Sequence, residues 1–194
     1  MANLWTLSNA LLGLGTYLLG SISTALVLVR LGYLADPRHI GSGNIGATNV
    51  LRQSKRHGLL VFLGDSVKGM IAVLIALYLN PDLIFLTVLT VTMGHCFPVF
   101  HGFRGGKGVA TAFGAILIAD AYLAGMGMLG FVLTLISTRR VSLASVMGAV
   151  CAALSYPFWY ALMPPWPLVL CALLITVRHR GNFQRILNGT EPKI

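Results

Sequence analysis

The residues best suited to chemistry lie in a glycine-rich polar stretch from Gly41 to Arg52, Gly-Ser-Gly-Asn-Ile-Gly-Ala-Thr-Asn-Val-Leu-Arg. Glycines let backbone amides approach a ligand closely, hydroxyl and carboxamide groups donate and accept hydrogen bonds, and an arginine adds a fixed charge. Such a loop suits a phosphate group, although the same residue types also make ordinary turns between helices. Its candidate ligand residues are Gly41, Ser42, Gly43, Asn44, Gly46, Thr48, Asn49 and Arg52.

A second polar cluster, from His101 to Thr111, leads directly into an apolar run. Backbone amides at a helix N-terminus, freed by glycines and backed by basic side chains, form a favourable anion site. The spacing lacks the P-loop pattern and no strand precedes it, which argues against an ATPase. The alternative is a basic anchor on the inner side of a membrane. The candidate residues are Arg104, Gly105, Gly106, Lys107 and Gly108.

Other polar residues lie within apolar runs. Asp65 and Lys68 share a helix face, where charged residues indicate either a site inside a helix bundle or a simple ion pair. Ser23, His95 and Ser142 are candidates of the same kind, each also compatible with an ordinary interhelical hydrogen bond.

The C-terminal tail contains His179, Arg180 and Asn182, which are site candidates if the tail does not simply bind anionic lipid head groups. Three isolated cysteines lack metal-ligand spacing and are expected to pack as small apolar residues. We predict no disulfide, no metal and no cofactor.

The composition predicts an integral membrane protein. The 194 residues are 56% hydrophobic and only 10% charged, with a mean hydropathy of +0.81, outside the range of a soluble domain. The net charge of +9 is explained by basic loops retained on the cytoplasmic side and by an anionic substrate, so we expect no nucleic acid partner.

Six long apolar runs are expected to form membrane helices. They extend over Leu4 to Val29, Leu59 to Leu79, Leu83 to Phe100, Val109 to Ser137, Leu143 to Leu162 and Leu168 to Val177. Short loops rich in Lys and Arg stay in the cytoplasm, so the run Val109 to Ser137, which has basic residues at both ends, must leave and return. We predict a turn at Asp120 between two arms of about 14 residues, each shorter than the roughly 20 of a straight span.

The resulting prediction is an all-α integral membrane protein: a single domain over residues 1–194 with seven transmembrane helices, some short. The N-terminus lies outside and the C-terminus in the cytoplasm. Every Lys and Arg except Lys68 then lies on the inner side. The loop at Gly41, the cluster at Gly105 and the tail at His179 meet at one membrane face, which favours a shared phosphate site over separate basic anchors.

Several motifs carry a family resemblance: Gly20-Ser21, Gly41 to Asn49, Gly64-Asp65 with Lys68-Gly69, Gly94-His95 with Pro98 to Phe100, Gly105 to Thr111, and His179-Arg180 with Asn182. Over nearly its whole length the chain resembles the bacterial membrane acyltransferases of the PlsY type, which move an acyl group from acyl phosphate to glycerol 3-phosphate. The resemblance implies a multi-pass enzyme of the bacterial inner membrane with its active site facing the cytoplasm, making lysophosphatidic acid and phosphate in the first step of phospholipid synthesis. It implies neither acyl-CoA nor acyl-carrier protein as donor. Arg104 stands where the family commonly has lysine, which changes the donor geometry.

We expect the C1 hydroxyl of glycerol 3-phosphate to attack the acyl carbonyl, with phosphate leaving. The predicted catalytic residues are Lys107, His179, Asn182 and Ser142. The predicted substrate-binding residues are Ser23, Gly41, Ser42, Gly43, Asn44, Gly46, Thr48, Asn49, Arg52, Lys68, His95, Arg104, Gly105, Gly106, Gly108 and Arg180. The base stays open among His179, His95, Asp65 and a phosphate oxygen of a substrate, which we favour.

The expected partners are acyl phosphate, glycerol 3-phosphate and membrane lipid, and we expect a monomer. Two other functions suit a basic membrane vestibule. A transporter for a phosphorylated solute is disfavoured because the predicted outer connections carry no basic residue. A lipid-binding membrane subunit without catalysis is favoured only if the purified protein fails to turn over.

Overall fold

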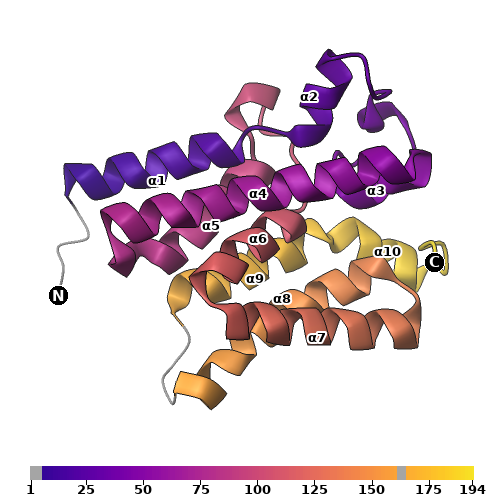
Figure 1. Cartoon of the computed structure of the whole chain (residues 1–194). Coiled ribbons are helices and arrows are strands. Elements are labelled where there is room, and N and C mark those ends of the chain that lie inside the picture. The colour runs from indigo at the N-terminus through magenta and orange to yellow at the C-terminus, as the bar shows by residue number, and fades with distance from the viewer. Residues whose placement is uncertain (1–5, 161–164) are drawn as a thin grey trace.

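The computed structural model describes residues 6–160 and 165–194, and within these ranges the chain forms helices and turns without a strand (Figure 1). In lipid the backbone must satisfy its own hydrogen bonds, which a helix does within one segment. The helices are α1 Leu7–Gly20, α2 Thr24–Arg30, α3 Ala47–Gln53, α4 Lys55–Leu79, α5 Ile84–Cys96, α6 Val109–Ala119, α7 Ala121–Thr138, α8 Val141–Tyr160, α9 Trp166–Arg178 and α10 Arg180–Leu187. Short 3-10 helices cover Pro37–His39, Pro81–Leu83 and Val99–His101. The predicted all-α architecture is confirmed, while the boundaries predicted at Leu4 and Leu162 lie outside the described residues.

Within residues 6–160 and 165–194, four helical segments are long and apolar enough to cross a membrane: α4, Pro81–His101 around α5, α7, and Val141–Phe158 of α8. The pair α1 and α2 makes a fifth if it is one span bent by 51°. Helices α6 and α9 are shorter and apolar. Large apolar side chains such as Leu74, Leu133 and Ile136 are exposed on these helices, as expected of a surface that faces lipid.

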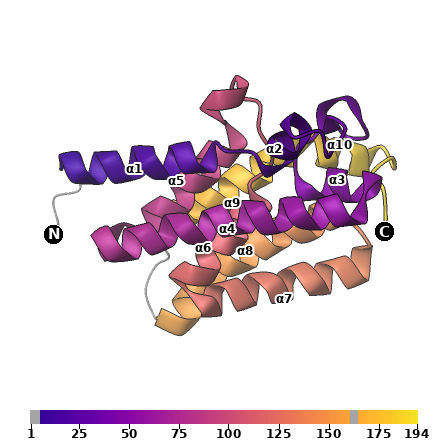
Figure 2. The ribbon, with the colours of Figure 1, turned by 45° about the horizontal axis from the view of Figure 1, so that its top comes forward.

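The connections lie at two opposite ends of the bundle (Figures 1 and 2). Figure 1 shows α2, α3 and α10 at one end, while α1 begins and α4 ends at the other. The turns between α4 and α5 and between α6 and α7, which contain no Lys or Arg, lie on the side of the bundle where α1 begins. The basic segments around α3 and α10 are therefore separated from the uncharged turns by the length of the bundle.

The predicted hairpin within Val109 to Ser137 is present, with its turn at Asp120. The Asp120 carboxylate accepts a hydrogen bond from the Leu123 amide at 3.1 Å and so begins α7, while the Asp120 amide closes α6 on the Ile116 carbonyl. The arms are unequal, however: α6 has 11 residues and α7 has 18. The expectation of two equal short arms was wrong because Asp120 lies much nearer to Val109 than to Ser137, and α7 continues to Thr138.

The first apolar run does not form one helix, because it breaks between Gly20 and Thr24. The Ser21 hydroxyl bonds back to the Tyr17 carbonyl, and the Ser23 side chain caps α2. Serine hydroxyls compete with the helix for backbone partners. The break leaves the Ile22 carbonyl free to accept a hydrogen bond from Lys68 Nζ at 2.7 Å. A helix interruption at this depth is acceptable when the freed groups find partners within the protein.

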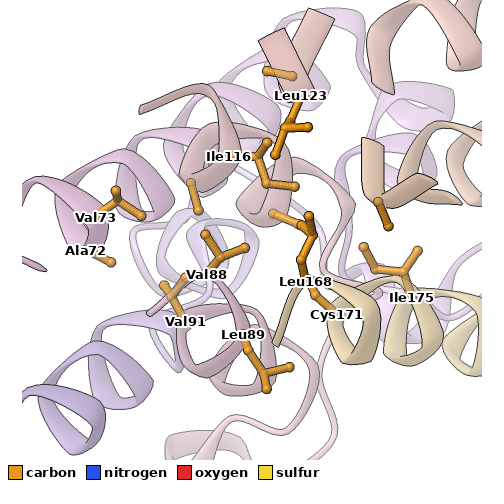
Figure 3. Close-up of a cluster of buried hydrophobic side chains, with 14 residues drawn as sticks. Ala72, Val73, Val88, Leu89, Val91, Ile116, Leu123, Leu168, Cys171 and Ile175 are labelled. Atoms are coloured by element: carbon orange, nitrogen blue, oxygen red, sulfur yellow. The ribbon is translucent and has the colours of Figure 1, made fainter. Parts of the chain in front are cut away.

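The main core joins α4, α5, α6 and α9, with contributions from α7 and α8 (Figure 3). Its labelled members include Ala72, Val88, Ile116, Leu168 and Ile175. Small residues let the backbones touch: a Cβ on Gly69 would lie 2.2 Å from the Thr111 carbonyl oxygen, and one on Gly114 would lie 2.1 Å from that of Ser66. Helix α6, which follows Lys107, is thus packed directly on α4.

Candidate active site

A polar cavity of about 170 Å³ lies where the glycine-rich loop, the start of α6, the start of α8 and the α9–α10 junction meet. These segments are far apart in the chain, yet each contributes side chains to the lining. The structure brings residues of the three polar segments into one cavity lining. The predicted site residues in the lining are Ser42, Asn44, Gly46, Thr48, Asn49, Arg52, His95, Lys107, Gly108, Ser142, His179 and Asn182.

The other predicted site residues lie outside the lining: Ser23, Gly41, Gly43, Lys68, Arg104, Gly105, Gly106 and Arg180. Arg104 and Arg180 are exposed, and the Ser23 side chain caps α2. Gly41 and Gly43 have φ angles of 60° and 70°, which side chains disfavour. These two glycines shape the loop.

Asn49 organises the glycine-rich loop from inside. Its Nδ2 lies 2.9 to 3.0 Å from the carbonyl oxygens of Pro37, Ile40 and Asn44, and its Oδ1 accepts the Ser42 amide at 3.0 Å. The side chain is buried, so these bonds replace those that water would make. Both ends of the carboxamide are used by the loop itself.

Lys107 reaches from the loop before α6 toward the tail. Its Nζ donates a hydrogen bond to Asn182 Oδ1, and Asn182 Nδ2 donates to Glu191 Oε1 at 2.7 Å. Burial lowers the pKa of Lys107 to about 8, against the opposing effect of Glu191 and with help from the positive charge of Arg185. At neutral pH the amine is therefore still mainly protonated and can attract an anion.

His179 is held in one tautomer. Its Nδ1 lies 2.8 Å from the Ile175 carbonyl oxygen, and because a carbonyl can only accept, Nδ1 carries the proton. Nε2 is then the unprotonated nitrogen. Burial and the positive charge of Lys107 lower the pKa of His179 to about 4, so the ring is neutral at neutral pH.

Asp65, Lys68 and His95 form a buried network beside the cavity. Lys68 Nζ lies 2.9 Å from Asp65 Oδ1 and 3.0 Å from His95 Nδ1, in addition to its bond with the Ile22 carbonyl. Thr24 donates to the same Asp65 oxygen at 3.0 Å. An ammonium can only donate, so His95 Nδ1 is an acceptor in this network. Asp65 and His95 line the cavity, whereas Lys68 lies behind them.

Arg185 and Glu191 also line the cavity, although neither was among the predicted site residues. Arg185 Nε lies 2.8 Å from Glu191 Oε2. The available signal was a single carboxylate in a tail that is otherwise basic. Phe62 and Phe131 line the cavity too, but an aromatic residue in an apolar helix cannot be told from a core residue by sequence pattern.

A second, apolar cavity of about 170 Å³ continues from the first between α6, α7 and α8. Phe62, Val109, Phe131 and Ser145 line both cavities. The apolar cavity extends along α8 from Ser145 to Ala152, with Leu123 beside its far part. The site thus combines a basic polar compartment with an apolar one.

The chain is similar to known glycerol-3-phosphate acyltransferases. The family model described as glycerol-3-phosphate acyltransferase matches residues 10–189. The glycerol-3-phosphate acyltransferase of Thioalkalivibrio sulfidiphilus is 46% identical, with 97% of this chain and 94% of that protein covered. The one from Caulobacter vibrioides is 47% identical, with 93% and 85% covered.

The fold also matches solved structures. The crystal structure of PlsY, an integral membrane glycerol 3-phosphate acyltransferase, in its glycerol 3-phosphate form superimposes with a TM-score of 0.87 at 38% identity, covering 95% of this chain and 94% of the other. The lysophosphatidic acid form gives a TM-score of 0.84 at the same identity and coverage. The chain therefore belongs to the glycerol-3-phosphate acyltransferase family of integral membrane enzymes.

Proposed function

We propose that this membrane acyltransferase takes its acyl group from acyl phosphate and releases lysophosphatidic acid and inorganic phosphate. The observation that carries the proposal is the junction of a basic polar cavity with an apolar one, shared by Val109, Phe131 and Ser145. The basic part suits phosphate groups, and the apolar part suits an acyl chain. An acyl phosphate spans this junction and carries no nucleotide or carrier protein that would need a further binding surface.

The chemistry needs little from the protein beyond positioning. The C1 hydroxyl oxygen of glycerol 3-phosphate forms a bond to the acyl carbonyl carbon, and the bond from that carbon to the phosphate oxygen breaks. The hydroxyl proton passes to a base, and inorganic phosphate leaves. A mixed anhydride is already activated, so holding both substrates together and stabilising charge supplies most of the acceleration.

In this proposal Lys107 and Arg52 bind phosphate oxygens from two sides of the polar cavity. Ser42, Asn44 and Thr48, on the glycine-rich loop, orient the glycerol hydroxyls and the phosphate. The support is that all five residues line the same cavity, four from the stretch Gly41 to Arg52 and Lys107 from the loop before α6. Asn182 holds the Lys107 amine, and Ser142 lies on the same wall at the start of α8.

For the base we favour a phosphate oxygen of a substrate. Asp65 is paired with Lys68, and His95 Nδ1 already accepts from Lys68. His179 has a free Nε2, but its low pKa makes it a weak base. Replacing each of the three in turn tests this: loss of turnover with retained glycerol 3-phosphate binding in one variant alone would identify a protein base instead.

We further propose that the chain crosses the bacterial inner membrane seven times, with the N-terminus outside and the site facing the cytoplasm. The support is the separation of basic segments from uncharged turns along the bundle (Figure 1). A cysteine placed at exposed Leu187 tests the sidedness. It should react with an impermeant thiol reagent in inside-out vesicles and not in right-side-out ones.

The donor is tested with purified protein in detergent or vesicles. Acyl phosphate and glycerol 3-phosphate should give phosphate and lysophosphatidic acid in equal amounts, and acyl-CoA and acyl-carrier protein should give none. Turnover with acyl-CoA alone would overturn the proposed donor. Movement of glycerol 3-phosphate across vesicles without lysophosphatidic acid would indicate a transporter.

A further inference from the structure

Arg178, the last residue of α9, hydrogen-bonds to the backbone of the two glycines that precede Lys107. Its Nε donates to the Gly106 carbonyl at 3.0 Å, and its Nη2 donates to the Gly105 carbonyl at 2.8 Å. Arg178 directly precedes His179 in the chain, just as Gly106 directly precedes Lys107. One guanidinium therefore joins the two backbone segments that carry Lys107 and His179.

The opposite side of the glycine pair is closed by His95. The Gly106 amide donates to the His95 carbonyl at 3.1 Å, and a Cβ on Gly106 would lie 2.1 Å from His95 Nε2. A Cβ on Gly105 would lie 2.1 Å from the His95 carbonyl oxygen. Only glycine fits in this gap, so the segment before Lys107 is held from both faces.

The other contacts of Arg178 favour this role over an ion pair. Its guanidinium lies 5.3 Å from the centroid of the Phe97 ring, and in the described part of the chain no carboxylate forms a salt bridge with it. Arg178 lines neither the polar nor the apolar cavity. A planar guanidinium donates to two adjacent carbonyls at once, which the single ammonium of lysine does less well.

We propose that Arg178 is a positioning residue for acyl transfer, which sets the placement of Lys107 relative to His179 without touching either substrate. The inference rests on the proposed function, because it assigns Lys107 to substrate phosphate. A misplacement of ~1 Å can lower a rate about 10²-fold. The loss of the two Arg178 hydrogen bonds should therefore lower mainly kcat.

The test measures kcat and KM for both substrates in Arg178→Ala and Arg178→Lys, with thermal stability of each protein measured in the same detergent. We expect a loss in kcat of about 10- to 100-fold for Arg178→Ala and a smaller loss for Arg178→Lys. Added guanidinium at millimolar concentration should restore part of kcat in Arg178→Ala only. Arg56→Ala is the control, because Arg56 is exposed in the first turn of α4 and lies outside both cavities.

A folded Arg178→Ala protein with the kcat of the wild type, or with a loss that guanidinium does not restore, would overturn the inference. If Arg178→Ala does not fold, Arg178→Lys decides: a stable protein with unchanged kcat overturns the inference, and one with lowered kcat supports it. If the wild type shows no turnover with acyl phosphate, that result contradicts the proposed donor but does not test the positioning role of Arg178. The same comparison is then made with the acyl donor that does support turnover.

Discussion

Lys107 Nζ donates a hydrogen bond to Asn182 Oδ1, and this contact ties the loop before α6 to the first turn of α10. Glu191 accepts from Asn182 Nδ2, so it fixes the orientation of the carboxamide and leaves Oδ1 for the amine. The acceptor is uncharged. The ammonium is therefore held in place while its charge remains available for an anionic ligand.

Lys107→Ala should remove most of the activity and leave the protein folded. Loss of one positioned charge that stabilises a reacting group typically costs about 10²- to 10³-fold in kcat. Lys107 is partly buried and its side chain lines the cavity, so its truncation should change thermal stability little. The measurement is steady-state turnover beside thermal unfolding of the purified protein.

Lys55→Ala is the matched control for that variant, because Lys55 is exposed at the start of α4 and lies outside the cavity. Its kinetics should equal those of the wild type. Full activity in Lys107→Ala would defeat the assignment of this amine to substrate phosphate.

The activity should fall as the pH rises through about 8, the pKa to which burial brings Lys107. Below that pH the amine is protonated and attracts phosphate, and above it the neutral amine does not. The basic limb of kcat/KM for glycerol 3-phosphate reports this change, since it follows groups of the free enzyme. In Lys107→Arg the side chain stays charged, so the basic limb should move to higher pH even if the rate is lower. If the basic limb of kcat/KM stays at the same pH in Lys107→Arg, that limb reports a group other than Lys107.

Much of this fold follows from simple patterns in the chain. The apolar runs predict helices because lipid offers the backbone no hydrogen-bond partners, so each segment must satisfy its own. Basic loops are expected at the cytoplasmic end of the bundle. That is why the sequence alone predicts a shared site for the segments of Ser42, Lys107 and His179, whose residues line one cavity. The turn at Asp120 was also predicted, because basic residues at both ends of the apolar run require a return and Asp120 interrupts that run.

Other features depend on contacts between residues far apart in the chain, and such contacts produce no periodic pattern in the sequence. The break after Gly20 exposes the Ile22 carbonyl to Lys68, but the two residues come together only when α4 packs on α1 and α2. Asn49 and Arg178 bind backbone carbonyls, and a carbonyl is present at every residue whatever its side chain. Sequence patterns therefore indicated the segments that line the candidate site but could not separate the residues that face the cavity from those that hold the backbone around it.

Lys68 should be a structural partner of Asp65, in contrast to the substrate-binding role expected from the sequence. Both side chains are buried and lie 2.9 Å apart. Lys68→Met leaves an unpaired buried carboxylate, and breaking a buried pair costs about 3–5 kcal/mol. The double variant Asp65→Asn with Lys68→Met should recover a large part of that loss, as thermal or denaturant unfolding would show.

The same double variant separates structure from binding. If Lys68 only neutralises Asp65, the recovered protein should bind glycerol 3-phosphate as the wild type does, because Lys68 lies outside the cavity lining. Asp65→Asn alone is the control, because Asp65 lines the cavity. A stable double variant that no longer binds glycerol 3-phosphate, while Asp65→Asn alone still binds it, would restore Lys68 to the substrate site.

Ala152→Leu should shorten the acyl chain that the enzyme accepts. Ala152 is buried on α8 and lines the far part of the apolar cavity. Gly127 of α7 lies close to it, since a Cβ added to Gly127 would lie 3.2 Å from the Ala152 methyl group. A leucine fills space that the end of a long chain would occupy. We expect kcat/KM to fall for long acyl phosphates and to stay unchanged for short ones, since one methylene in an apolar pocket is worth about 1–3 kcal/mol.

Leu154→Phe is the control, because Leu154 is exposed on the same helix and its replacement should alter no chain-length preference. Equal losses for short and long donors in Ala152→Leu would mean that the acyl chain lies elsewhere.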